Sequence, residues 1–151
     1  YAFQATGFSR VRRNADALAA WDKALALDKD LALSPVRGQL RLGRLITTAR
    51  LGQHAQAVAE AEAEVKGASF FLGASTHYNA ACVYAGAVEG AAGDAALAER
   101  YAARAVQLLR QAVAKGYRAA AEMRTDRDLD PLRRRNDFAA LLWDMAELPA
   151  R

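Results

Sequence analysis

The sequence predicts an all-α protein, and three features of its composition lead to that class. Hydrophobic residues make up 53% of the 151-residue chain, and many of them are alanine, the strongest helix former. Proline occurs only three times, so few helices would be interrupted. The β-branched residues that favour strands are scarce. A chain of this length is expected to form one domain with a core of its own.

Capping residues and prolines divide the chain into predicted helices. We expect helices over residues 1–12, 15–28, 35–51, 53–66, 74–88, 95–115 and 137–147, and short helical turns over residues 119–124 and 129–134. Asn14 and Asp94 each precede a helix and are suited to accept a hydrogen bond from its first turn as N-caps. Ser34 and Pro35 start the third helix, because proline favours the first helical position.

Glycines end several of these helices. Gly52, Gly67 and Gly116 each follow a helical stripe, and glycine readily adopts the left-handed conformation that closes a helix. Residues 70–72, which are Phe-Phe-Leu, are expected to pack under the end of a neighbouring helix. The chain opens inside the first helix with no cap before Tyr1, so we expect a fragment of a longer protein that starts within a repeat.

The helix over residues 15–28 carries an apolar stripe of small and large residues. Ala17, Trp21 and Ala24 recur at helical spacing, so they share one side of the helix. The alanines let a neighbouring helix come close, while the tryptophan ring fills the space beside them. This stripe, closed by Leu25-Ala-Leu-Asp28, resembles the second helix of a tetratricopeptide repeat (TPR). The resemblance implies an array of helical hairpins.

Two later helices repeat the small-residue pattern. Aligned on the second helix of each hairpin, the sequence gives three columns: Ala17, Ala57 and Ala105; Trp21, Ala61 and Leu109; Ala24, Glu64 and Ala112. The repeats lie 40 and 48 residues apart, whereas a regular TPR recurs at 34 residues. Glu64 also departs from the pattern. We expect a single domain over residues 1–151 with about three divergent TPR-like hairpins, rather than an unrelated bundle, and a C-terminal cap over residues 118–151.

The C-terminal region carries a second resemblance. Residues 126–133, Asp-Arg-Asp-Leu-Asp-Pro-Leu-Arg, and residues 137–142, Asp-Phe-Ala-Ala-Leu-Leu, resemble the end of TPR segments attached to bacterial serine/threonine protein kinases. Residues 77–84, His-Tyr-Asn-Ala-Ala-Cys-Val-Tyr, resemble the last first-helix of those segments. The resemblance implies a kinase domain upstream of Tyr1, with this chain as its accessory or docking region. The kinase motifs themselves are absent, so we expect no enzyme activity from this fragment.

The charge balance bears on the kind of partner that we expect, and the single cysteine bears on the cellular location. The net charge of +4 arises within residues 100–151, where it is mixed with acidic side chains. So small an excess does not predict binding to nucleic acid. One cysteine cannot form an internal disulfide, which fits a reducing compartment, and we expect a cytoplasmic location. There is no signal peptide and no apolar run of about 18 residues, so we expect no membrane insertion.

The chain contains cysteine and histidine residues that could serve in catalysis or metal binding, but their spacing suits neither role. Cys82 follows His77 by five residues on one predicted helix, which places their side chains about 140° apart. Even with Asn79 between them, we therefore expect a buried structural cysteine instead of a nucleophile. His54 and His77 lack the spacing of a metal site.

Two charged runs near the C-terminus have structural and functional interpretations. Asp126, Asp128 and Asp130 alternate as in a calcium loop, but the glycine and the final glutamate of such a loop are absent. We expect turns and helix caps there. Residues 133–135, three arginines, could bind phosphate or an acidic partner, but such a run more often lies in solvent before a helix. The sequence therefore predicts no catalytic residue, no cofactor and no metal.

The register of the TPR resemblance selects residues that would line a groove for a protein or peptide partner. These candidates are Leu42, Ile46, Arg50, Tyr78, Asn79 and Cys82. Asn79 falls where some peptide-binding TPRs hold the ligand backbone, but the paired lysines of a carboxylate clamp are absent.

Two other functions remain open at this point. An enclosed pocket with clustered titratable groups would favour a helical enzyme or a small-ligand domain. A groove filled by other segments of the full chain would favour an intramolecular spacer. The sequence does not fix the identity of the partner or the oligomeric state.

Overall fold

The computed structural model describes residues 13–27, 35–67 and 73–147, with the backbone alone described over residues 35–39. Every regular element in these ranges is a helix. In chain order they are α2 (Asn14–Leu27), α3 (Pro35–Arg50), α4 (His54–Gly67), α5 (Gly73–Gly90), α6 (Ala95–Ala114), α7 (Ala120–Thr125), the 3₁₀-helix η1 (Arg127–Leu132) and α8 (Asn136–Ala146). The described part of the chain contains no strand, which confirms the all-α class.

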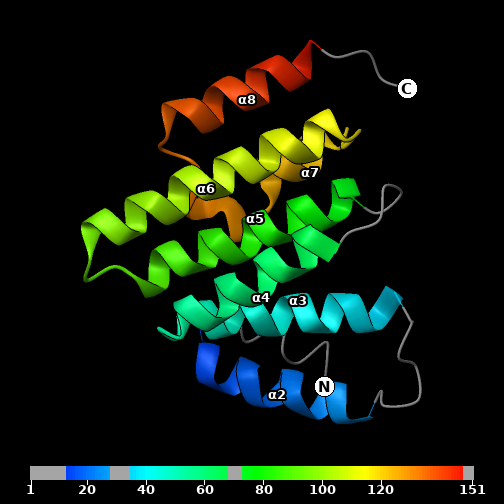
Figure 1. The fold of residues 1–151 in the computed structure, drawn as a ribbon, viewed down its shortest axis with the longest axis vertical. Helices are drawn as coiled ribbons and strands as arrows, with labels where there is room; N and C mark the ends of the chain where they lie inside the picture. The colour runs from blue at the N-terminus through cyan, green and yellow to red at the C-terminus, as the bar shows by residue number, and fades with distance from the viewer. Residues whose placement is uncertain (1–12, 28–34, 68–72, 148–151) are drawn as a thin grey trace.

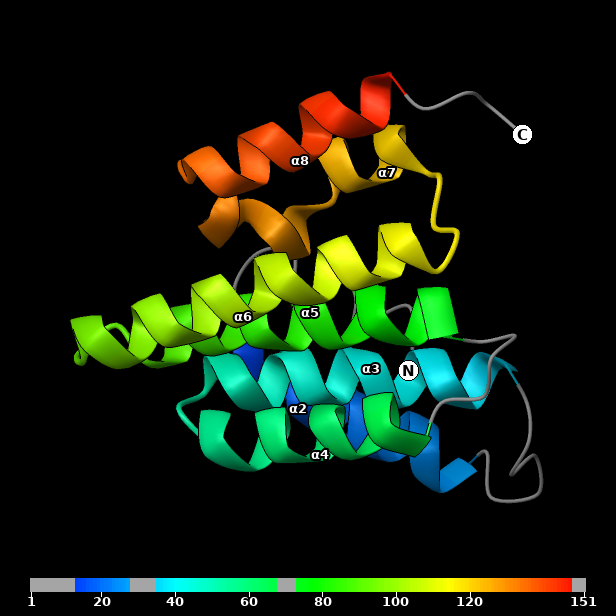
Figure 2. The same ribbon diagram turned by 45° about the horizontal axis from the view of Figure 1, so that its top comes forward.

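The long helices are arranged as hairpins stacked side by side. Short turns join α3 to α4 and α5 to α6, and consecutive helices among α2 to α6 run antiparallel (Figure 2). Helix α5 is central, because it packs against α3, α4 and α6, while α2 packs against α3. Helices α2 and α8 lie at opposite ends of the molecule (Figure 1).

Local signals in the sequence explain where several helices begin and end. Gly52 follows α3 with a φ of 89° and Gly116 follows α6 with a φ of 105°, and both values lie in the left-handed region that favours glycine. The carboxylate of Asp94 accepts a hydrogen bond of 2.9 Å from the Leu97 amide and caps α6, as expected. The expected cap at Asn14 is wrong, because Asn14 is already the first residue of α2 and its buried Oδ1 accepts no hydrogen bond.

Trp21 fixes the contact between α2 and α3. Its side chain is 7% exposed, which confirms that it is a core residue. The indole lies against Gly43, where a Cβ atom would overlap the ring. Beside it, Arg44 donates from Nε to the Asp22 carboxylate at 2.7 Å. The pair of helices is therefore held by an apolar contact with an ion pair at its edge.

Helix α5 approaches α3 closely because two of its residues are glycine. A Cβ atom on Gly90 would overlap the carbonyl oxygen of Ala49, and one on Gly86 would lie 3.1 Å from the carbonyl oxygen of Ile46. Larger residues at these positions would push the helices apart.

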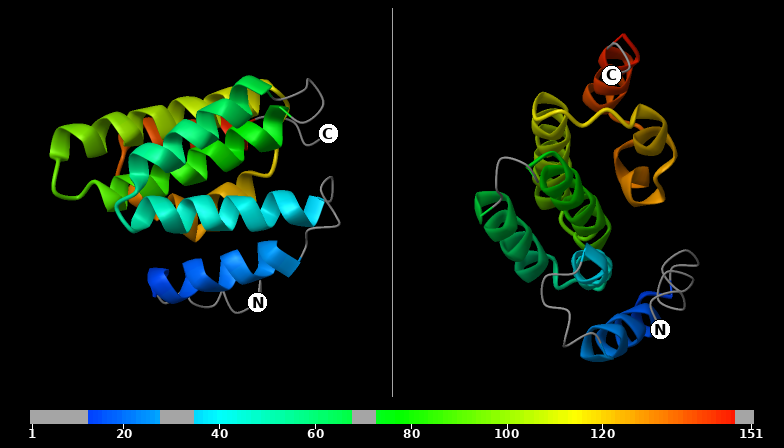
Figure 3. Two further views of the ribbon diagram at one scale, coloured as in Figure 1. Left: turned by 60° about the horizontal axis from the view of Figure 1, so that its bottom comes forward. Right: turned by 90° about the vertical axis from the view of Figure 1, so that its right-hand side faces the viewer.

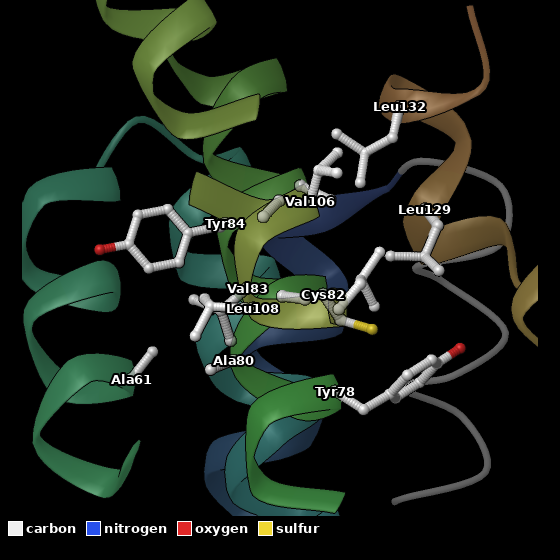
Figure 4. Close-up of a cluster of buried hydrophobic side chains, with 14 of the residues drawn as sticks. Ala61, Tyr78, Ala80, Cys82, Val83, Tyr84, Val106, Leu108, Leu129 and Leu132 are labelled. Carbon is white, nitrogen blue, oxygen red and sulfur yellow. The ribbon is translucent and has the colours of Figure 1, made fainter. Parts of the chain in front are cut away.

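The main core surrounds the α5–α6 hairpin, with α3 and α4 on one side and the C-terminal elements on the other. Its largest fully buried side chains include Leu108, Leu109, Met123, Leu129 and Phe138. Segment η1 and α7 lie on the side of α5 opposite α4 (Figure 3, right). Figure 4 shows the two sides of this core, with Ala61 and Tyr84 on the α4 side and Leu129 and Leu132 on the η1 side.

Helix α8 covers the far end of this core. Phe138, Leu141 and Met145 are buried and form its inner stripe, while Leu142 is half-buried. The predicted helix over residues 1–12 and the Phe-Phe-Leu segment at residues 70–72 lie outside the described residues.

Candidate functional site

The face of α5 that the sequence assigned to a groove is covered by the chain's own segment η1. Leu129 and Leu132 project from η1 toward the α5–α6 hairpin, and both side chains are fully buried (Figure 4). Polar contacts surround these two leucines. The segment is therefore part of the core and also the occupant of the predicted groove.

Asp126 anchors the start of η1. Its Oδ2 accepts a hydrogen bond of 2.6 Å from the Tyr78 hydroxyl and lies 3.9 Å from the Cys82 Sγ, which donates to it. Its Oδ1 accepts from the backbone amide of Asp128 at 2.9 Å and so caps η1, as expected for this aspartate run. The Tyr78 ring stacks on Tyr117 with centroids 4.5 Å apart.

Arg50 joins the ends of two helices to η1. Its Nη2 donates to Asp128 Oδ1 at 3.0 Å, and its Nε lies 3.0 Å from Glu89 Oε2 at the end of α5. The Arg50 side chain is only 6% exposed. A guanidinium so deeply buried would be costly to leave unpaired, and the two carboxylates compensate its charge.

Three groups of this site, Cys82, Tyr78 and Asp128, have pKa values raised above their ordinary values. Burial raises the pKa of the Cys82 thiol well above its ordinary value, and the nearby charges of Asp126 and Asp128 add to the shift. Burial is also the main cause of the raised pKa of Tyr78. Burial raises the pKa of Asp128 too, although Arg50 opposes that shift. Cys82 and Tyr78 are therefore protonated donors at neutral pH, and a thiol is a poor nucleophile.

Three of the six predicted groove residues meet at this site. Arg50, Tyr78 and Cys82 all contact Asp126 or Asp128. Ile46 is 4% exposed and packs between α3 and α5, so it contributes to helix packing and not to an open surface. Leu42 and Asn79 are half-buried, and Leu42 packs against the main core.

Sequence reasoning missed the acidic half of the site. Glu89, Asp126 and Asp128 supply the carboxylates that pair with Arg50 and Tyr78. The alternating aspartates were recognised as caps, but no local pattern links Asp128 to an arginine 78 residues earlier.

The His–Cys constellation is not assembled. The His77 Nδ1 donates to the carbonyl oxygen of Gly73 at 2.6 Å, one turn earlier in α5. Cys82 faces Asp126 instead. Within the described ranges, no three His, Cys, Asp or Glu residues are placed to hold a metal ion.

The arginine run near the C-terminus precedes α8, and Arg133 and Arg134 are exposed, as expected, but two of its arginines also contact other parts of the chain. Arg133 donates to the carbonyl oxygens of Arg124 and Asp126 and pairs with Asp130 at 2.8 Å. Arg135 pairs with Asp137 at 2.9 Å and with Glu99 of α6 at 2.6 Å. Two of the three arginines are thus engaged within the chain.

A second polar cluster lies on the α4 side of α5. Arg104 of α6 donates two hydrogen bonds to the Glu62 carboxylate of α4, at 2.7 and 3.0 Å. The Tyr84 hydroxyl donates to the same carboxylate at 3.0 Å. Burial, followed by this bond, raises the pKa of Tyr84 to about 12. Three helices are joined at one carboxylate, so the cluster stabilises their packing.

No protein-family model, curated protein or solved structure matches this chain. None of the described helices is long and apolar enough to span a membrane. The function therefore has to be argued from the geometry.

Proposed function

We propose that this chain is a TPR-like helical-repeat module that binds a protein or peptide partner. The observation that carries the proposal is the first alanine column. Ala17, Ala57 and Ala105, from α2, α4 and α6, are each 0% exposed. An alanine is thus fully buried at the equivalent position of α2, α4 and α6, and a helical repeat buries a small residue in this way where its units stack.

The other two columns support the same register. Trp21, Ala61 and Leu109 are 7%, 3% and 0% exposed. In the third column Ala24 and Ala112 are buried, whereas Glu64 is exposed and pairs with Arg41 of α3 at 2.9 Å. An ion pair between the two helices of the middle hairpin takes the place of an apolar contact there.

The filled groove limits where a partner would bind. Arg50, Tyr78 and Cys82 already contact η1, so a partner would have to use the remaining face of α3 and α5. Leu42 and Asn79 are half-buried groove candidates, and within the described part of the chain neither forms a hydrogen bond or an ion pair with η1. We propose that they contribute to the contact with the partner.

A catalytic role is less well supported. The clustered titratable groups at η1 are paired with one another, and the Cys82 thiol is protonated at neutral pH. The residues that carry the kinase resemblance, among them Asp126, Leu129 and Leu132, have structural roles that any chain of this fold could use. The proposal that the chain is an accessory region of a cytoplasmic signalling protein such as a kinase therefore rests on that resemblance.

Affinity capture from a reducing cell extract with the intact chain as bait tests the proposal. Asn79→Ala should reduce recovery of a specific partner several-fold, whereas an alanine at the exposed Gln53, before α4, should not. Arg50→Glu is unsuitable because it would place a new negative charge beside the partly exposed carboxylates of Glu89 and Asp128. Equal recovery with Asn79→Ala and Gln53→Ala would contradict the placement of the site.

A further inference from the structure

The outer face of α8 carries a copy of the stripe by which α2 binds α3. Residues 17–24 read Ala-Leu-Ala-Ala-Trp-Asp-Lys-Ala, and residues 139–146 read Ala-Ala-Leu-Leu-Trp-Asp-Met-Ala. Alanine, tryptophan, aspartate and alanine therefore recur at the same four positions of the two segments. Both segments are helical, so the four side chains have the same relative placement in each.

The two copies differ in what covers them. In α2 the stripe is buried against α3, where Ala17, Trp21 and Ala24 are at most 8% exposed. In α8 the equivalent Trp143 is 72% exposed, and Ala139 and Ala146 are exposed as well. The inner residues of α8 are a different set, so this outer stripe is not needed for packing on α6 and α7.

The contact between α2 and α3 defines the chemistry of a matching helix. Gly43 of α3 leaves room for the indole, and Leu40 packs in the same apolar cluster one turn earlier. Arg44 follows the glycine and pairs with Asp22. A helix with the pattern Leu-x-x-Gly-Arg is therefore complementary to the Trp-Asp pair in both shape and charge.

We propose that the outer face of α8 is a docking surface for a partner helix of the α3 type. Trp143 would insert beside a glycine of that helix, Ala139 and Ala146 would allow close approach, and Asp144 would pair with the following arginine. Asp144 is exposed, as Asp22 is, so the pair would form at the edge of the interface. The copies are not identical throughout, because Leu142 stands where α2 has the buried Ala20. The half-buried Leu142 packs against the chain's own core, so the partner would contact the exposed part of the stripe at Ala139, Trp143 and Ala146 and leave Leu142 in place.

A helical peptide with the sequence of α3 serves as the probe. Residues 35–50 are synthesised with a staple joining positions 41 and 45, whose native side chains face α4 and the main core and not α2. The peptide is titrated into the intact 151-residue protein while the indole N–H signals of its two tryptophans are followed by NMR. Trp143→Phe assigns the two signals. We expect a saturable shift of the Trp143 signal alone.

Two matched changes test the recognition itself. A peptide with Gly43→Leu should bind at least about ten-fold more weakly, equivalent to about 1.4 kcal/mol, because a side chain there occupies the space of the indole. Asp144→Arg in the protein should weaken binding of the parent peptide several-fold, and a peptide with Arg44→Glu should restore it.

Four results would overturn the proposal. They are the absence of a saturable shift, equal binding of the Gly43→Leu peptide, a shift of the Trp21 signal instead, and a Trp143 shift that follows protein concentration without peptide. The third result would mean that the peptide replaces the chain's own α3, and the fourth that a second copy of the chain covers α8. None of these results depends on Asn79. Rejection of the α8 docking surface is therefore distinguishable from rejection of the proposed partner contact at Leu42 and Asn79.

Discussion

The two tryptophans of this chain lie in the same local sequence pattern, but replacing them should change the stability of the fold by very different amounts. Trp21 fills the contact between α2 and α3, so Trp21→Ala should lower the free energy of unfolding by about 3–5 kcal/mol. Trp143→Ala should change it by about 0.5 kcal/mol or less, because the ring is exposed. Urea denaturation followed by circular dichroism measures both. Similar losses from the two variants would contradict the burial of Trp21.

Glu62 gives a prediction for the acid limb of the stability curve. Its hydrogen bonds with Arg104 are the largest cause of a pKa below the ordinary value of 4.5. Because the folded-state pKa is lower than the unfolded one, the ionised carboxylate stabilises the fold above about pH 4.5. That contribution is lost as the pH falls through the folded-state pKa.

Glu62→Gln should therefore cost about 1 kcal/mol at pH 7, since solvent partly screens the pair, and it should make the acid limb shallower. Glu64→Gln on the same helix is the control, because its pair with Arg41 is much more exposed. Thermal melting between pH 3 and 7 distinguishes the two variants. An unchanged acid limb in Glu62→Gln would mean that the cluster does not stabilise the fold.

At the scale of elements, the contact between α3 and α5 depends on the absence of a side chain at Gly90. Gly90→Ala should lower stability by about 1–3 kcal/mol or more, because the added Cβ would overlap the backbone carbonyl of Ala49. Gly93→Ala is the matched control, since no atom lies within 4 Å of a Cβ built there. If Gly90→Ala melted like Gly93→Ala, the two helices would have to be farther apart than described.

The sequence was sufficient for the elements whose signals are local. Asp94, Gly52 and Gly116 mark helix ends through their own chemistry, and the alanine columns identified which side of each helix is buried. The prediction of an N-cap at Asn14 was wrong because a residue type that caps helices well can also stand one position inside a helix. The groove register brought Arg50, Tyr78 and Cys82 to one face, as the structure places them.

The occupant of that face could not be predicted from local patterns. The contact of Arg50 with Asp128 depends on how the C-terminal segment folds back, and helical periodicity carries no information about such distant pairs. The partners of Arg133 could not be predicted for a similar reason. Its partners include the backbone carbonyls of Arg124 and Asp126, which accept hydrogen bonds only once α7 and η1 have formed.

At the scale of the whole molecule, the C-terminal elements should be essential for stability. Deleting residues 126–151 would uncover apolar side chains on the η1 side of the core, such as Val106, and leave Arg50 without Asp128 (Figure 4). We expect aggregation or a clear fall in melting temperature, measured by light scattering and calorimetry. Deleting residues 136–151 alone keeps η1 and should cost less. A monomeric, equally stable 1–125 chain would show that η1 and α8 are dispensable.

The Arg50–Asp128 pair also sets an order of events while the chain is being made. Because the N-terminal part leaves the ribosome first, the α3–α4 hairpin and α5 can form while Tyr78 and Cys82 are still uncovered. Leu132 is 50 residues beyond Cys82, a delay of roughly 3–10 s at typical rates of synthesis. During that interval the central helix presents an open face to chaperones and to neighbouring nascent chains, and translation speed through residues 83–132 becomes a determinant of yield.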